Sequence, residues 1–205
     1  MDEAMTRYLT SDLHIGHVNI IEYCNRPYKN VPEMNADLVE RWNSVVGADD
    51  EVFIIGDLAM GKLDDSLVYV GLLNGMKHLV PGNHDRMFGC QGTKYANAVK
   101  RYLDAGITDV LEDEFPMNLQ DDFRVWVNHF PYQGDSREGH EDRYQDRRPA
   151  DYGRRLIHGH VHGVWRRNDR MIDVGVDAWG GYPVSFDAVV NLFNSDDTNA
   201  VPVPW

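Results

Sequence analysis

Cysteine is almost absent from this sequence, in which Cys24 and Cys90 are the only two among 205 residues. A fold held by disulfide bonds needs several cysteines, and a structural zinc site needs closely spaced ones. These two lie far apart in the sequence and satisfy neither requirement. We therefore expect two reduced thiols and a fold that depends on its apolar core, for which 42% hydrophobic residues suffice.

Long apolar runs are also missing. No stretch approaches the roughly 18 apolar residues of a membrane span, and the segment Met1 to Thr6 has neither the basic region nor the apolar run of a signal peptide. These absences predict a cytoplasmic protein with no membrane partner. The chain length fits one domain that spans residues 1–205.

Positive charge is scarce as well, because 20 Lys and Arg residues face 33 Asp and Glu residues and leave a formal net charge of -13. Non-specific binding to a polyanion requires clustered Lys and Arg that release its counterions. Long nucleic acid is therefore disfavoured as a partner.

The first half of the chain alternates strand-like and helix-like segments. Residues 7–11 and 52–55 are short apolar runs that stop at a turn containing an aspartate, as buried strands do. Between them, apolar residues recur at three- and four-residue spacing over residues 32–47, which predicts an amphipathic helix. We also expect helices over about residues 64–73 and 93–104, and a strand over residues 77–80.

The second half changes to the period of two that is typical of antiparallel strands. Residues 110–119 and 123–129 are β-rich runs separated by turn-forming residues, which predicts a hairpin. The remaining strand candidates are residues 156–158, 171–174 and 185–193, the last of which could start as a helix. This order predicts a layered α/β sandwich with its functional loops at the carboxyl ends of the strands.

The segment 131–153 is long, charged and without periodicity. Loops of this length in a compact domain are usually functional or mobile. One interpretation is a solvated loop, because its positive and negative charges balance. The other is a lid or insertion that provides an arginine to a phosphate group. Its arginines are Arg137, Arg143, Arg147 and Arg148.

Residues with metal-binding side chains follow the strand-like runs in order. They are Asp12-Leu13-His14, Gly56-Asp57, Gly82-Asn83-His84-Asp85, His129 and Gly159-His160-Val161-His162. The first two are common patterns, whereas a given four-residue string recurs by chance on the order of once in 10⁵ positions. Carboxylate, amide and imidazole donors without a thiolate suit Mn²⁺, Fe²⁺ or Zn²⁺. The series predicts a metal site.

At these residues the sequence resembles the calcineurin-like metallophosphoesterase superfamily, whose signature is Asp-x-His, Gly-Asp, Gly-Asn-His-Asp/Glu, a lone His and Gly-His-x-His. The match spans residues 12–162. The resemblance implies an αββα sandwich of two mixed β-sheets flanked by helices. It implies one ion held by Asp12, His14, Asp57 and His162, and a second held by Asp57, Asn83, His129 and His160. Asp57 would bridge the ions, and His84 would be the catalytic residue beside the substrate.

The sequence departs from the protein phosphatase branch of that superfamily, in which the Gly-Asp motif continues to a second Asp and an Arg. Here Met60 and Gly61 follow Gly56-Asp57-Leu58-Ala59, which disfavours a phosphoprotein phosphatase and leaves the orienting partner of His84 unidentified. The missing phosphate contact could come from Arg26, Arg86 or an arginine of residues 137–148, although such arginines are more often surface charges. The segment Ser11 to His17 more closely resembles small bacterial and phage phosphoesterases that open with Ser-Asp-x-His-x-Gly-His.

The leading functional hypothesis is a dinuclear metal-dependent phosphodiesterase that acts on a small phosphodiester such as a cyclic nucleotide. Two divalent ions, Mn²⁺ by first choice and Fe²⁺, Zn²⁺ or Ni²⁺ as alternatives, would lower the pKa of a bridging water. The resulting hydroxide would attack phosphorus in line, while His84 protonates the leaving oxygen. The alternatives are a phosphomonoesterase for nucleotides or sugar phosphates, a single-strand nuclease, and a non-catalytic scaffold. The complete ligand series argues against the scaffold.

Other residues have open assignments. His17 could contact a ligand or the substrate, or could cap a turn. His158 is expected to be structural, because it lies within a strand and should point away from the surroundings of His160 or into the core. Asn19, Asn128 and Asp177 are candidates for hydrogen bonding to ligating histidines, and Tyr23, Trp165, Trp179 and Tyr182 could stack on a base or belong to the core.

Overall fold

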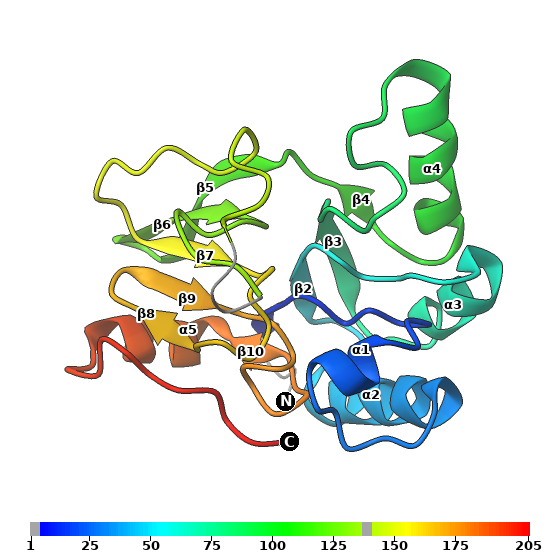
Figure 1. The fold of residues 1–205 in the computed structure, drawn as a ribbon, viewed down its shortest axis with the longest axis horizontal. Coiled ribbons are helices and arrows are strands. Elements are labelled where there is room, and N and C mark those ends of the chain that lie inside the picture. The colour runs from blue at the N-terminus through cyan, green and yellow to red at the C-terminus, as the bar shows by residue number, and fades with distance from the viewer. Residues whose placement is uncertain (1–4, 137–140) are drawn as a thin grey trace.

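The computed structural model describes residues 5–136 and 141–205, which contain two five-stranded β-sheets (Figure 1). In the first sheet, the four parallel strands β1 to β4 lie side by side, and β10 joins the outer edge of β1 in the antiparallel direction. The strands are β1 (Arg7–Thr10), β2 (Glu51–Ile55), β3 (Met76–Val80), β4 (Asp109–Val110) and β10 (Val184–Ser185).

The second sheet has the order β5-β6-β7-β9-β8. Its central strands β6, β7 and β9 are parallel, whereas β5 and β8 are antiparallel to their neighbours. The strands are β5 (Glu114–Gln120), β6 (Phe123–Asn128), β7 (Leu156–His158), β8 (Arg167–Asn168) and β9 (Met171–Asp173). Two mixed sheets with helices confirm the predicted layered α/β class, and the β5–β6 pair confirms the predicted hairpin.

Four of the helices gather on one side of the first sheet, away from the second sheet (Figure 1). They are α1 (Ile20–Tyr23), α2 (Val31–Val45), α3 (Leu63–Val70) and α4 (Gly92–Asp104). The helix α2 begins where Asn30 accepts a hydrogen bond from the Glu33 backbone N–H, and it buries Leu38 and Trp42. These contacts match the helical spacing in the sequence.

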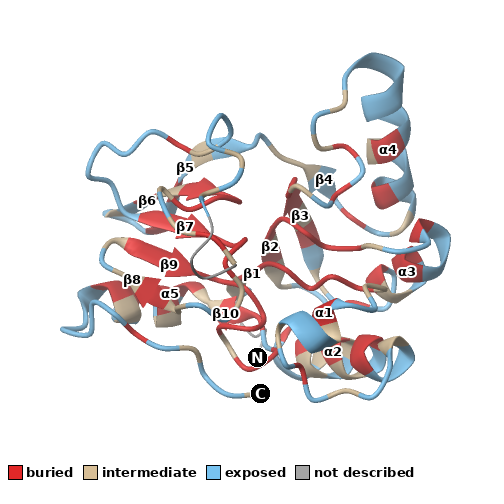
Figure 2. Cartoon of the chain, viewed as in Figure 1, coloured by how far each residue is buried: buried red, intermediate tan, exposed pale blue. Residues whose placement is uncertain are grey.

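Two apolar clusters form the core. One lies between the first sheet and α1 to α4, with Ile54 and Trp42 among its members. The other lies between the two sheets and includes Leu9, Val127 and Ile172. Figure 2 shows this burial in the strands of both sheets and in the loops between them. None of the described helices combines the length and the apolar character that crossing a membrane requires.

The strand predicted over residues 185–193 is wrong, and the helical alternative is correct. Only Val184 and Ser185 form a strand, and the helix α5 (Phe186–Asn194) follows directly. The Ser185 hydroxyl accepts a hydrogen bond from the Ala188 backbone N–H and so caps this helix. The buried faces of Phe186, Val189, Val190 and Phe193 then pack into the cluster between the sheets.

The run predicted as one strand over residues 110–119 is divided between the two sheets. Asp109 and Val110 end the first sheet, and Glu114 begins the second. The chain therefore crosses from one sheet to the other at this point. The parallel strands of both sheets end around a shared region, where the loops that follow β1, β2, β3, β6 and β7 meet (Figure 1).

Candidate metal centre and cleft

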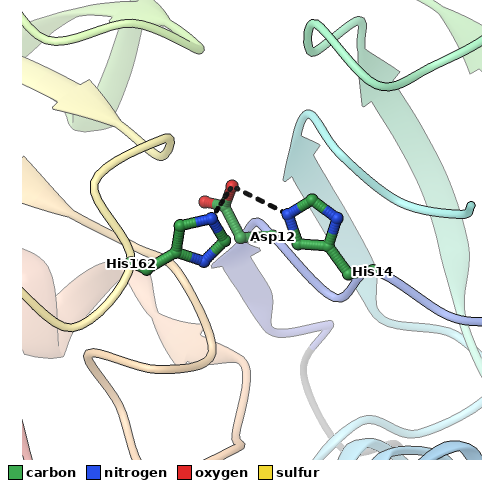
Figure 3. A group of neighbouring side chains, drawn as sticks. All are labelled: Asp12, His14 and His162. Carbon is green, nitrogen blue, oxygen red and sulfur yellow. Dashed lines mark ion pairs between the residues drawn. The ribbon is translucent and has the colours of Figure 1, made fainter. Parts of the chain in front are cut away.

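The structure brings the predicted site residues together in these loops. Both sheets contribute: Asp12 and His14 follow β1, Asp57 follows β2, Asn83 and His84 follow β3, His129 follows β6, and His160 and His162 follow β7. Residues up to 150 positions apart in the sequence, Asp12 and His162, therefore approach one another. Figure 3 shows His14 and His162 on opposite sides of Asp12, with both imidazoles directed toward its carboxylate.

The backbone at these residues adopts conformations that L-amino acids rarely use. Five of the eight residues have positive φ angles: Asp12 (55°), His14 (51°), Asp57 (55°), His160 (72°) and His162 (55°). Each such conformation costs about 1–3 kcal/mol and persists only where surrounding contacts enforce it, commonly at functional sites. Their concentration here marks the site independently of the motif series.

Glycines in the motifs allow the side chains to approach closely. A Cβ atom on Gly82 would overlap the Asp57 carboxylate, and one on Gly159 would overlap the Asp12 carboxylate. Gly56 has a φ of 89°, and a Cβ atom at this position would overlap the His129 ring. A side chain at any of these three positions would displace a candidate ligand.

One group of candidate ligands contains Asp12, His14 and His162, and Asp57 adjoins it. The His14 Nε2 atom lies 3.8 Å from Asp12 Oδ1 and 3.6 Å from Asp57 Oδ2, and His162 Nε2 lies 4.0 Å from Asp12 Oδ1. Ligands bound at about 2.0–2.2 Å to one ion lie roughly 3–4 Å apart. Asp12 Oδ1 and His14 Nε2 are buried and have no hydrogen-bond partner among the described residues. Orphaned donors of this chemistry fit a divalent cation.

A second group shares Asp57 with the first. Asp57 Oδ2 lies 3.5 Å from His129 Nε2, which in turn lies 3.2 Å from Asn83 Oδ1. The same amide oxygen lies 3.1 Å from His160 Nδ1. Because Asp57 Oδ2 is within 3.6 Å of an imidazole nitrogen in each group, it occupies a position between them.

The second ring nitrogen of several of these histidines has its own partner. In a neutral ring, an N–H donated on that side leaves the opposite nitrogen as a lone pair that faces the centre. The partners are the Ile55 carbonyl for His129 Nδ1 (2.8 Å), Asp177 for His162 Nδ1 (3.1 Å) and Asp135 for His160 Nε2 (3.3 Å). The sequence had suggested Asp177 as such a partner, together with Asn128, whose Oδ1 instead accepts from the Phe130 backbone.

Burial and charge set the protonation of the centre. Burial lowers the pKa of His14 well below its ordinary value and keeps this imidazole neutral. Burial acts the same way on His129, but the Asp57 carboxylate outweighs it and raises the pKa of His129 to about 9. The His129 ring in turn holds the pKa of Asp57 well below its ordinary value against the effect of burial. The centre thus carries a carboxylate that favours cations beside it.

Asp85 ties the loops of the first sheet together, a role that the motif series did not reveal. Its carboxylate accepts hydrogen bonds from the backbone N–H groups of Asp57 (2.9 Å), Leu58 (3.2 Å) and Gly82 (2.9 Å). Burial and the nearby Asp57 charge raise the pKa of Asp85 to about 7. Asp85 thereby fixes the loop after β2 against the loop after β3.

Two of the arginines suggested as phosphate contacts have their guanidinium groups bonded to other partners. Arg26 is neither a phosphate contact nor a surface charge, because it is 3% exposed and forms a buried ion pair with Asp177 at 2.8 Å. Arg86 is exposed and donates to the Gly61 carbonyl. Arg137 lies outside the described residues.

A cleft of about 570 Å³ opens onto the candidate ligands. His84 lines it, with its ring 5.3 Å from the His14 ring and its backbone N–H donated to Asp57 Oδ1 at 2.8 Å. His17 also lines the cleft, its ring is 6.3 Å from that of His84, and burial lowers the pKa of His17 to about 4. The cleft wall further includes Asn19, Ile20, Tyr23, Cys24, Ser136, Arg143, Val161 and Val164.

Three further residues have the roles that the sequence suggested. His158 is buried and accepts a long hydrogen bond from the Trp165 indole N–H at 3.4 Å, in keeping with a structural role. Cys24 and Cys90 are both free thiols. Trp165 and Trp179 are part-buried, whereas Tyr23 is 62% exposed at the cleft.

The fold and the site thus define a layered α/β protein with a candidate metal centre at its strand ends. No family model matches the chain. It is 36% identical over 212 residues to the Gene 66 protein of Mycobacterium phage L5, covering 91% of this chain and 93% of that protein. It is 31% identical over 187 residues to the uncharacterized protein MJ1445 of Methanocaldococcus jannaschii, with coverages of 90% and 89%. The chain belongs to the family that contains these proteins.

A solved structure shows the same fold. It is the protein of unknown function AQ665 from Aquifex aeolicus, which aligns with a TM-score of 0.66 and 22% sequence identity. The alignment covers 92% of this chain and 99% of that chain. The arrangement of two sheets is therefore shared along almost the whole length of both proteins.

Proposed function

We propose that this protein is a dinuclear metallophosphoesterase, and that it hydrolyses a small phosphodiester. The observation that carries the proposal is the pair of buried atoms Asp12 Oδ1 and His14 Nε2, which lie beside Asp57 Oδ2 and have no hydrogen-bond partner within residues 5–136 and 141–205. Such atoms lose their hydration without compensation unless a cation is bound.

The donor arrangement supports two sites that share one carboxylate. Asp12, His14, Asp57 and His162 would hold one ion, and Asp57, Asn83, His129 and His160 would hold the other. Mn²⁺ is the ion that we propose, with Fe²⁺, Zn²⁺ or Ni²⁺ as alternatives, because the donors are oxygen and imidazole nitrogen without thiolate. When bound, two divalent ions stabilise charge on phosphoryl oxygens and lower the pKa of a coordinated water.

His84 is the residue that we assign to proton transfer. It projects into the cleft beside the candidate ligands, and its backbone N–H is fixed to Asp57. From this position its imidazole can donate a proton to the leaving oxygen, a contribution of about 10²–10⁴ in rate for a positioned acid. The His84 imidazole can perform this role without binding a metal ion.

The shape and surroundings of the cleft favour a small substrate. Its volume of about 570 Å³ exceeds what a phosphoryl group alone requires, and Ile20, Tyr23, Val161 and Val164 give its wall an apolar part. A diester with an organic group, such as a cyclic nucleotide, fits both properties. The net charge of -13 disfavours long nucleic acid. A phosphomonoesterase is the alternative, because His84 would assist either leaving group.

The test is hydrolysis of bis(p-nitrophenyl) phosphate, p-nitrophenyl phosphate and 2′,3′-cyclic AMP by metal-stripped protein, before and after addition of Mn²⁺. We expect diester cleavage only with the metal, and its loss in Asn83→Ala. Asn118→Ala, on the exposed side of β5, serves as the matched control and should keep full activity.

The other outcomes separate the alternatives. A higher rate on the monoester than on the diester would replace the diesterase with a phosphomonoesterase. Degradation of single-stranded oligonucleotides would indicate a nuclease. If Mn²⁺, Fe²⁺, Zn²⁺ and Ni²⁺ all fail to support turnover, the enzyme hypothesis is rejected and the non-catalytic scaffold remains.

A further inference from the structure

The loop between β6 and β7 reaches the candidate metal centre through Asp135. The side chain of this residue is 1% exposed, and its Oδ2 atom lies 3.3 Å from His160 Nε2. No spacing rule distinguishes Asp135 in the sequence from the other carboxylates of its loop. The structure alone places it behind a candidate ligand.

The same carboxylate holds an arginine at the rim of the cleft. Arg143 Nε lies 3.1 Å from both Asp135 oxygens, and Arg143 Nη2 lies 2.5 Å from Asp135 Oδ1. The Nη2 atom also donates to the Ser136 hydroxyl at 3.0 Å. Asp135 therefore joins His160 and Arg143 through one carboxylate.

Arg143 is available to a ligand despite these contacts. Its side chain is 43% exposed, and it lines the cleft together with Ser136, Asn83 and His84. Its Nη1 atom makes no hydrogen bond within residues 5–136 and 141–205. A guanidinium with one edge on a carboxylate and the other edge open is preorganised for an anion.

The other described arginines of residues 131–153 do not line the cleft, although Arg148 Nη2 also lies 3.7 Å from Asp135 Oδ2. Arg148 is almost buried, with 6% of its side chain exposed, and it donates to the carbonyl groups of Arg143 and Pro131. Arg147 pairs with the exposed Asp146 and lies over the Phe88 ring. Neither lines the cleft. Within the described part of the loop, Arg143 is thus the arginine that meets the candidate site.

We propose that Asp135 is a positioning residue that orients His160 as a metal ligand and Arg143 as a phosphate-binding residue. This inference rests on the proposed function. It assigns a phosphate subsite at the cleft rim and gives Asp135 and Arg143 a role in catalysis.

Two variants separate the two roles of Asp135, and each is compared with the native protein loaded with Mn²⁺. In Asp135→Asn, we expect Mn²⁺ affinity at one site to fall about 10–100-fold, as when a carboxylate behind a ligating histidine is lost. In Arg143→Ala, Mn²⁺ affinity should remain within twofold, and the affinity for inorganic phosphate should fall at least tenfold. Titration calorimetry with Mn²⁺, and then with phosphate, measures both.

Arg147→Ala is the matched control, because it removes an arginine of the same loop that does not line the cleft. It should change neither affinity. In the double variant Asp135→Asn and Arg143→Ala, the loss of phosphate affinity should be smaller than the product of the two single losses, since both act on one group. In hydrolysis of the diester, we expect Arg143→Ala to raise KM and Arg143→Lys to raise it less, because lysine keeps the positive charge.

Unchanged Mn²⁺ affinity in Asp135→Asn, or unchanged phosphate affinity in Arg143→Ala, would overturn the inference. If Asp135→Asn fails to fold, Arg143→Ala still decides the phosphate subsite. Native protein that binds no Mn²⁺ would instead refute the proposed function. Native protein that binds two Mn²⁺ ions and hydrolyses the diester, with both variants unaltered, would refute this inference alone.

Discussion

At the scale of single residues, the side chains of the candidate ligands face the centre of the site, whereas the side chain of His84 faces the cleft. The imidazoles of His14 and His129 lie within 3.6 Å of the shared Asp57 carboxylate. His84 has only its backbone N–H on Asp57, and its side chain is exposed to the cleft. A residue so placed can be removed without removing a candidate metal ligand.

We therefore predict that His84→Ala lowers kcat about 10²–10⁴-fold, the usual contribution of a positioned general acid. The Mn²⁺ stoichiometry measured on the same sample should stay at that of the native protein. The control is His78→Ala, which removes a histidine that pairs with Asp109 on the first sheet. Loss of bound metal in His84→Ala, or full activity, would contradict the assignment to proton transfer.

At the scale of elements, Arg26 connects two loops that support the site. Its guanidinium donates to the backbone carbonyl groups of Asp12 (2.7 Å) and Leu13 (2.9 Å) after β1. It also forms two hydrogen bonds to Asp177 in the segment after β9, at 2.9 and 2.8 Å. Because Asp177 in turn contacts His162, the chain Arg26, Asp177 and His162 fixes one candidate ligand from outside.

Removal of the Arg26 guanidinium should destabilise the fold strongly. Arg26→Ala leaves the buried Asp177 carboxylate without its partner, and breaking a buried ion pair in this way costs about 3–5 kcal/mol. Arg101→Ala breaks a surface pair with Asp64 whose partners are 44% and 77% exposed, and it should cost less than about 1 kcal/mol. Urea unfolding of both variants measures the difference. Equal destabilisation by the two changes would show that Arg26 does not hold these loops.

At the scale of the whole molecule, the candidate ligands come from both sheets. Asp12, His14, Asp57 and Asn83 belong to the first sheet, and His129, His160 and His162 belong to the second. Direct contacts between the sheets also exist here, because the His160 backbone N–H donates to Asp12 Oδ2 at 2.9 Å. A cation bound at this point would connect the two halves of the molecule.

Metal binding should accordingly stabilise the fold. Free Mn²⁺ at 100 times its dissociation constant adds about 2.7 kcal/mol for one site, which corresponds to a rise in Tm of about 5–10 °C for a chain of this size. EDTA should reverse the rise, and calorimetric scans with and without the metal measure it. Asn83→Ala should reduce the shift and Asn118→Ala should not. An unchanged Tm at saturating Mn²⁺ would argue against ions held between the sheets.

Several elements could be predicted from local pattern because their causes are local. The spacing of Leu38 and Trp42 predicted α2, and the turn between β5 and β6 predicted the hairpin. The boundaries that failed depend on distant contacts. Residues 109–120 divide between two sheets because Val110 pairs with Leu79 whereas Phe115 pairs with Val127, and no property of the run itself indicates these partners.

The sequence by itself determined which side chains can bind a metal and in what order they occur, because each motif is a short string at the end of a strand. Only the tertiary structure decided what stands behind them: Asp135 behind His160, Asp177 and Arg26 behind His162, and Arg143 at the cleft rim. The physical reason is that these contacts join loops whose relative positions follow from the pairing of strands and the packing of two sheets. That arrangement is set by the sum of many contacts between residues distant in the chain, and no single segment encodes it.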